Sequence, residues 1–209
     1  MVKIEFSNEK LLQTAWKRFS EKGVFWVLIT VFSLLLTTPT PIPYLSTILF
    51  VLSIYFSASI TLMTIRYMNG QEVSMEDLLA VDFNTFLHYI FTTLVSGLLI
   101  ILGFLFLILP GFYLMVRLMM AQYLVLDKDM SYDSAIKESW RITKDNELNL
   151  MGFLLVMFLI ILSGFLAFFI GLLIAIPITQ LCTAMLYLIF SKSTASEEDS
   201  ESLTAIDYE

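Results

Sequence analysis

One arginine inside an apolar run is the residue of this sequence most suggestive of a specific chemistry. Arg117 lies about 10 Å of helix beyond Pro110, at about 1.5 Å per residue. Charged side chains within membrane segments are costly and mark functional sites by default. We favour a side chain that extends to outer-leaflet phosphates. Two other roles stay open, which are hydrogen bonding to Gln180 or to carbonyl groups near proline-bearing turns, and an anion site for a lipid headgroup or a solute.

A catalytic centre is not expected. Hydrolysis would need a nucleophile, a base and a group that orients the base. The single histidine, His88, follows Asp82 at a spacing that places the two side chains on different faces of a helix. We therefore interpret His88 as a packed or interfacial side chain and the protein as a non-enzyme.

Residues that could hold a metal or a cofactor are also missing from the pattern. Cys182 is the only cysteine and lies in an apolar stretch, which rules out an internal disulfide and a cysteine metal site. We expect no metal, no cofactor and no nucleic-acid partner. No acid lies within the apolar runs, so we do not expect an intramembrane salt bridge or a carboxylate proton relay.

Four glycines are interpreted as close-packing or kink positions in membrane helices: Gly97, Gly103, Gly164 and Gly171.

The composition is that of a membrane protein. Of the 209 residues, 58% are hydrophobic and 15% are charged, whereas a soluble domain carries about a quarter charged residues. Each helical crossing needs about 20 apolar residues. Six apolar segments are present, of which the first and fourth are short: 24–38, 44–65, 86–109, 111–126, 149–169 and 172–190.

The distribution of charge predicts a topology. Three proline-bearing turns, at 37–43, 109–111 and 171–177, contain no charged residue. Because Lys and Arg concentrate in cytoplasmic loops, we place both termini and both long loops inside. The prediction is a bacterial inner-membrane protein with six crossings and three short outer turns. The charged N-terminal segment lacks the features of a signal peptide, so we expect the first apolar helix to direct insertion.

An internal repeat organises the chain into three units, at about 7–66, 74–127 and 131–190. Ser7, Ser74 and Ser131 are each followed by an acid two residues later and by an apolar pair at four and five. A serine followed by an acid is a helix start. A large aromatic residue stands nine residues after each serine: Trp16, Phe83 and Trp140. We predict an all-α fold of three transmembrane hairpins, each preceded by an amphipathic cytoplasmic helix.

The third of these helices is strongly amphipathic. Its apolar face includes Trp140, and its charged face pairs Asp133 with Lys137 and Glu138 with Arg141 at helical spacing. Such a helix either lies in the lipid headgroup region or covers the cytoplasmic end of the bundle. After the last crossing, residues 191–209 are rich in acid, serine and threonine, and we expect a disordered, solubilising tail rather than a partner-binding one.

Segment 109–146 carries the densest motif, LPGFYLMVRLMMAQYLVLDKDMSYDSAIKESWRITKDN. It resembles a bacterial membrane domain found fused to some glycerophosphoryl diester phosphodiesterases, and the related YciC-like proteins. The resemblance covers the second half of the chain well and the first half only in general architecture. It implies a membrane fold without the phosphodiesterase activity, because six helices and a tail account for 209 residues. The matching elements are Pro110-Gly111, Arg117, Leu126-Asp127, Ser139-Trp140-Arg141, Asn146 and Leu186-Tyr187.

Two functions follow from these patterns. The first is a non-enzymatic accessory subunit that binds a membrane protein complex through its interfacial helices, with Trp16, Phe83, Trp140 and Arg141 as contacts. The alternative is the handling or transport of lipids or amphiphiles, with Arg117 and Gln180 contacting an anionic headgroup. Membrane lipids are expected partners in both. An ion-coupled transporter is disfavoured because the crossings lack acids.

Overall fold

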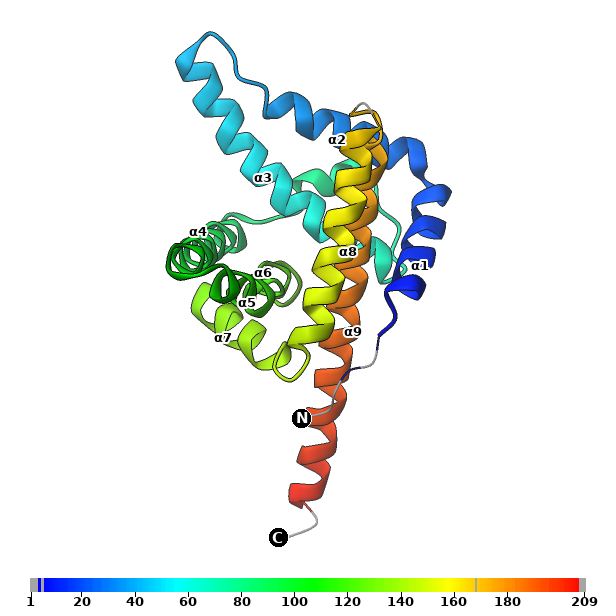
Figure 1. The fold of residues 1–209 in the computed structure, drawn as a ribbon, viewed down its shortest axis with the longest axis vertical. Coiled ribbons are helices and arrows are strands. Elements are labelled where there is room, and N and C mark those ends of the chain that lie inside the picture. The colour runs from blue at the N-terminus through cyan, green and yellow to red at the C-terminus, as the bar shows by residue number, and fades with distance from the viewer. Residues whose placement is uncertain (1–3, 5, 168, 207–209) are drawn as a thin grey trace.

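The computed structural model describes residues 4, 6–167 and 169–206, and every regular element among them is helical. The all-α prediction is therefore confirmed for this part of the chain. Figure 1 shows the arrangement. The elements are α1 (Asn8–Glu21), α2 (Gly23–Leu36), α3 (Pro43–Met68), the 3₁₀ helix η1 (Met75–Leu79), α4 (Phe83–Phe106), α5 (Ile108–Leu118), α6 (Ala121–Lys128), α7 (Tyr132–Ile142), α8 (Glu147–Leu166) and α9 (Leu172–Ile206).

Five helical segments are long and apolar enough to cross a membrane: Tyr44–Met68, Phe83–Phe106, Ile108–Lys128, Glu147–Leu166 and Leu172–Thr194. The predicted first crossing corresponds to α2, which has only 14 residues. The number of possible crossings would reach six only if α1 and α2, which meet at a bend of 92°, form one broken span. The described residues thus contain five to six segments of this kind, which is compatible with a multi-pass membrane protein.

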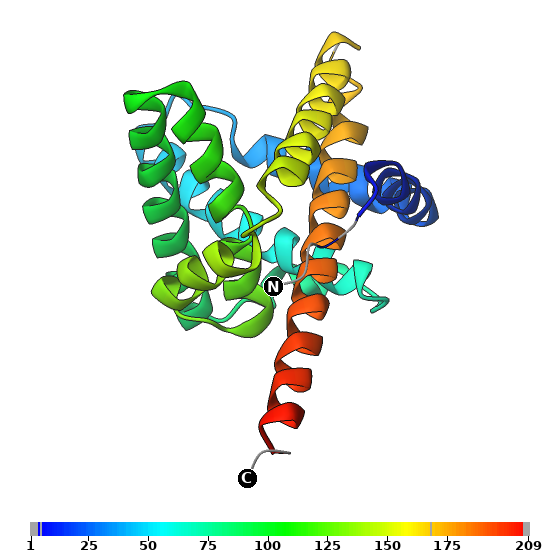
Figure 2. The same cartoon turned by 60° about the horizontal axis from the view of Figure 1, so that its bottom comes forward.

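The helices do not form a single parallel bundle. In Figure 1, α8 and α9 run side by side along the vertical axis, whereas α4 and α5 are seen nearly end-on. In Figure 2 the turn after α4 and the turn after α8 both lie at the top of the view, and the C-terminal end of α9 extends below the rest. Helix α9 is the central element, because α1, α2, α3 and α8 all pack against it.

Close glycine contacts hold α4 against α5 and α8 against α9. A Cβ atom added to Gly103 would lie 3.0 Å from Gly111 Cα, and one added to Gly164 would lie 3.0 Å from the Gly171 carbonyl. These three predicted close-packing glycines are confirmed. Gly97 has open space around it, so close packing does not apply there, and the kink alternative stays a prediction.

The turn between α4 and α5 lies slightly before its predicted place. Leu107 alone links the two helices, with an extended backbone, and Pro110 lies in the first turn of α5. Proline is tolerated there because the first amides of a helix have no intrahelical partner. The next predicted turn also begins early, since α8 ends at Leu166 and Pro177 lies within α9.

The three repeated serines do begin helices, but the three helices differ. Ser7, Ser74 and Ser131 are the N-caps of α1, η1 and α7. The second unit has only the five-residue η1 in place of an amphipathic helix, so that part of the prediction is wrong. A new helix starts at Phe83 because the Asp82 carboxylate accepts hydrogen bonds from two amides of α4.

Helix α9 extends past the last apolar residues into the acidic segment, to Ile206, and residues 207–209 lie outside the described part. The solubilising tail predicted from residue 191 stays a prediction. Adding residues to an existing helix costs little, since only nucleation is unfavourable. The buried Thr194 hydroxyl donates to the Phe190 carbonyl at 2.9 Å.

Candidate functional site

Arg117 lies in a closed cluster and not at an outer surface. Its side chain is 2% exposed, and its Nη1 donates to Glu147 Oε1 at 3.0 Å. The guanidinium carbon lies 4.5 Å from the ring centroid of Trp140 and 5.7 Å from that of Tyr113. The preferred prediction, contact with outer-leaflet phosphates, is therefore wrong, and so is the expectation that no salt bridge would form.

Three helices position this cluster. Arg117 and Tyr113 come from α5, Trp140 from α7, and Glu147 is the first residue of α8. The buried Ser139 hydroxyl donates to the Arg117 carbonyl at 2.8 Å, which ties α7 to the C-terminal end of α5. A carboxylate at a helix N-terminus also interacts favourably with the helix dipole. The sequence places Glu147 just before an apolar run, where its approach to Arg117 is not visible.

The chemistry of the cluster is that of a neutralised cation. The carboxylate balances the charge, and the indole face of Trp140 contributes a cation–π contact. One donor of the guanidinium, Arg117 Nε, is buried without a hydrogen-bond partner in the described structure. Removing one partner of a buried ion pair costs about 3–5 kcal/mol, because the other charge stays buried. Such a cluster fastens three helices together and leaves no free cation for an anion.

The predicted charged face of α7 is confirmed. Lys137 Nζ lies 3.7 Å from Asp133 Oδ2, and Arg141 makes two hydrogen bonds of 2.8 Å to Glu138. The Ser131 hydroxyl donates to Asp133 (2.7 Å) and holds the pKa of that carboxyl below its ordinary value. On the apolar face of α7, the Trp140 ring contacts Arg117 and Tyr113 and is 39% exposed. Whether this helix lies in the headgroup region or covers the bundle stays a prediction.

The other predicted interfacial residues lie on separate elements. Trp16, on α1, is 55% exposed, and its ring lies 6.1 Å from that of Phe19. Phe83, the first residue of α4, is 74% exposed. In α1 and α7 the small residue before the tryptophan, Ala15 or Ser139, is fully buried. The tryptophans therefore lie at the edge of the packed face, and Trp140 is 39% exposed.

Gln180 lies in a different place from the one proposed for it. It lines a cavity of about 350 Å³ between α2, α3, α4 and α9, and Arg117 is not among the lining residues. Its side chain makes no hydrogen bond to any described residue, so the predicted bond to Arg117 is absent. The cavity is lined by Ser33, Leu36, Thr37, Ser53, Ile54, Phe56, Ser57, Ile60, Tyr89, Thr93 and Gln180.

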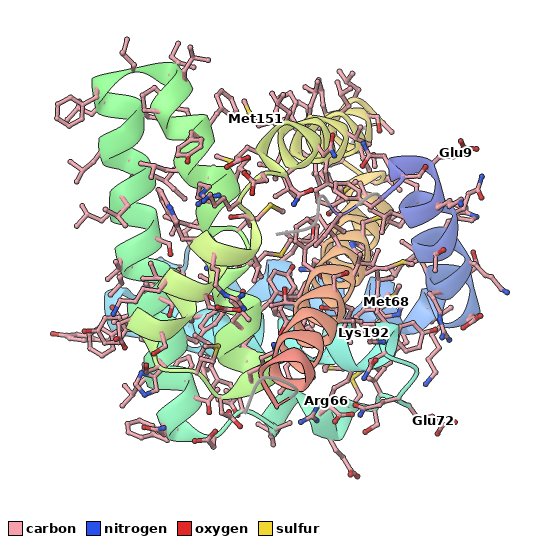
Figure 3. All side chains as sticks on the ribbon, turned by 90° about the horizontal axis from the view of Figure 1, so that it is seen from below. Glu9, Arg66, Met68, Glu72, Met151 and Lys192 are labelled. Carbon is pink, nitrogen blue, oxygen red and sulfur yellow. The ribbon has the colours of Figure 1, made fainter. Side chains whose placement is uncertain are left out.

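A second group of polar contacts joins the charged ends of the helices. The Tyr187 hydroxyl donates to Asp127 at 2.7 Å, and the Thr85 hydroxyl donates to Asp129 at 2.8 Å. Asp127 and Tyr187 both belong to the motif noted in the sequence, but only the structure brings them together. Figure 3 shows the side chains from below, with the charged residues Glu9, Arg66, Glu72 and Lys192 among those labelled.

The candidate catalytic residues do not meet. The His88 ring stacks on Tyr132, with 6.3 Å between ring centroids. Asp82 accepts hydrogen bonds from the amides of Asn84 and Thr85, at 2.9 and 3.2 Å. The Cys182 side chain is fully buried. Within the described residues no three His, Cys, Asp or Glu side chains are grouped as metal ligands would be.

Comparison with known proteins identifies only an uncharacterised domain. A family model described as a domain of unknown function, DUF7847, matches residues 79–198, which is more than half of the chain. The match runs from the end of η1 through the apolar part of α9. No curated protein and no solved structure matches. Nothing found links the chain to the phosphodiesterase-associated domain or to the YciC-like proteins that segment 109–146 resembles.

Proposed function

The chain belongs to the DUF7847 family, and we propose that it acts without catalysis, as an accessory subunit of a membrane protein complex. The proposed location of the protein is the bacterial cytoplasmic membrane. Both termini would lie inside, and the apolar segments would form three hairpins. Support for this topology comes from the three charge-free turns and from the positive-inside rule.

One observation carries the proposal, namely how the polar side chains at the charged end of the bundle are used. Arg117 pairs with Glu147, Tyr187 with Asp127, and Thr85 with Asp129. Each contact joins segments that are far apart in the chain. Because these groups are occupied in holding the helices together, they are poorly suited to turnover of a substrate. A protein built in this way acts through its surfaces.

The exposed aromatic residues of the charged end are the proposed contacts. Trp16, within α1, and Phe83, the first residue of α4, are both more than half exposed. Tryptophan and phenylalanine are enriched in protein–protein contacts. They also anchor helices at the membrane interface, so a partner subunit must be distinguished from lipid by experiment.

Purification of the full chain in a mild detergent tests the proposal. We expect one defined membrane protein to co-purify at a constant ratio, and Trp16→Glu to abolish its retention. Lys17→Glu is the matched control, because it adds an acid at the adjacent exposed position of α1. If no protein is retained at a fixed ratio, or if both variants retain the partner equally, the accessory-subunit proposal is wrong.

Handling of an anionic lipid is the second candidate function. Arg117 supports it less well than the sequence suggested, since binding an anion there requires displacement of Glu147. If the protein handles an anionic lipid, a phospholipid should co-purify in stoichiometric amount, and Arg117→Lys should lose it. Lysine keeps the positive charge but not the two-pronged donor geometry of arginine.

A further inference from the structure

We propose that the cavity around Gln180 binds an uncharged lipid with a hydroxyl-bearing headgroup, of which a diacylglycerol is the simplest example. The inference is independent of the proposed accessory function. It rests on three properties of the cavity, which are its place in the fold, the hydrogen-bonding groups on its walls and the absence of charge among its lining residues.

The cavity lies within the membrane segments and borders the outer turn. Ser57 belongs to the crossing formed by α3, Tyr89 to that of α4, and Gln180 to that of α9. A second hollow, of about 500 Å³, lies beside the 37–43 turn and shares Leu36, Thr37 and Ser53 with the cavity. The two hollows therefore border each other at these three residues, beside the 37–43 turn.

The walls of the cavity present many unused hydrogen-bond acceptors. The Ser33 hydroxyl donates to the Ile29 carbonyl at 2.9 Å, and the Ser53 hydroxyl donates to the Phe50 carbonyl at 2.7 Å. A hydroxyl that donates to its own helix keeps lone pairs for another donor. The same helix-directed bond is made by Thr37. A ligand hydroxyl entering the cavity therefore meets acceptors on α2 and α3.

Gln180 adds an amide that has both donors and an acceptor. No hydrogen bond within the described structure uses it, although it lies at membrane depth. Transfer of an amide from water to an apolar environment is unfavourable unless a hydrogen bond compensates it. Across the cavity, Ser57 and Tyr89 hydrogen-bond to each other at 3.3 Å, a long contact that a better-placed ligand group can replace.

The lining residues exclude a charged headgroup. None of the eleven is Asp, Glu, Lys, Arg or His. A phosphate or carboxylate would lose its hydration without gaining a cation, and Arg117 is already paired with Glu147. Between the polar groups the walls are apolar, formed by Leu36, Ile54, Phe56 and Ile60. This combination fits an alkyl or acyl chain that ends in a hydroxyl.

The size of the cavity agrees with a lipid headgroup. Its volume of about 350 Å³ lies within the range of about 300–1,000 Å³ for small-molecule sites, and one water occupies about 30 Å³ of liquid. A single ordered water would thus leave most of the space unfilled. The adjoining outer hollow gives the rest of the lipid a place outside the cavity.

Photolabelling of the full chain in lipid nanodiscs tests the inference. The probe is a diacylglycerol with a photoreactive group near its glycerol, and an equal amount of similarly labelled phosphatidylglycerol is the comparison. We expect diacylglycerol to label peptides of α3 and α9 at a saturable site. Gln180→Leu should weaken labelling about two- to tenfold, the effect of one hydrogen bond.

A matched pair of serines separates occupancy of the cavity from general damage. Ser53→Phe fills the cavity and should abolish labelling, whereas Ser163→Phe should not. Ser163 makes the same kind of bond, to the Ile160 carbonyl at 2.8 Å, on α8 outside the lining. Equal labelling by phosphatidylglycerol, unsaturable labelling, or equal effects of the two serine variants would overturn the inference. No partner protein is required, so this test can fail or succeed independently of the co-purification.

Discussion

Glu147→Gln should destabilise the protein more than any other single replacement of a charged residue by an uncharged one at the charged end of the bundle. The substitution keeps the shape of the side chain and one oxygen acceptor near Arg117 Nη1, but it removes the balancing charge. Because Arg117 is 2% exposed, its cation cannot recover water, and we expect a loss of about 3–5 kcal/mol. For a chain of this size, that corresponds to a fall in melting temperature of about 6–20 °C.

Arg117→Leu should be milder. It leaves behind a carboxylate that is 27% exposed and can be hydrated, so only the packing against Trp140 and the ion pair itself are lost. The double variant Arg117→Leu with Glu147→Gln has no buried charge, and replacing a buried pair by apolar groups is often close to neutral. We therefore expect a coupling of at least about 3 kcal/mol between the two sites, because the double variant should recover the whole cost of Glu147→Gln.

The assay is thermal unfolding of the purified chain in one detergent, followed by intrinsic tryptophan fluorescence. Lys137→Gln is the control, because it breaks an ion pair of α7 whose two side chains are both more than half exposed; its melting temperature should not change. If the effects of Glu147→Gln and Arg117→Leu add without coupling, the two side chains do not form the pair described, and the account of this cluster fails.

Two further predictions concern the topology in cells and the glycine contacts of the purified chain. Cysteine at Thr40 should react with an impermeant reagent on intact cells and cysteine at Asp145 only after permeabilisation, and labelling of Asp145 from outside would reverse the proposed topology. Gly164→Ala should lower the melting temperature, since its Cβ would press against the Gly171 backbone. Gly97→Ala, which has open space, should raise it slightly through higher helix propensity, and equal effects would refute the glycine contact.

Local features of the fold could be predicted from the sequence because they depend on neighbouring residues. The serine helix starts at Ser7, Ser74 and Ser131, and the ion pairs of α7, follow from spacings of a few residues. The membrane segments follow from composition over about 20 residues. The prediction of a second amphipathic helix was wrong for an equally local reason. Asp82 is the N-cap of α4, so a new helix begins soon after η1.

The contacts of the candidate sites could not be predicted, because they depend on how distant segments pack. Arg117 and Glu147 are brought together by α7, which lies between them in sequence and supplies Trp140 and Ser139. The prediction considered acids only inside the apolar runs, and Glu147 stands just outside one. An acid at the first turn of a crossing should therefore be considered as a partner for an arginine near the end of another.

The two sites also depend on different parts of the chain. The Arg117 cluster uses α5, α7 and α8 and lies wholly within residues 79–198, the segment matched by the DUF7847 model. The Gln180 cavity needs α2 and α3 as well, which precede that segment. The ion pair that stabilises the fold thus lies within the matched domain. The proposed lipid site instead lies where the preceding helices, α2 and α3, contact that domain. Substitutions in α2 should accordingly alter labelling by diacylglycerol while leaving the coupling between Arg117 and Glu147 unchanged.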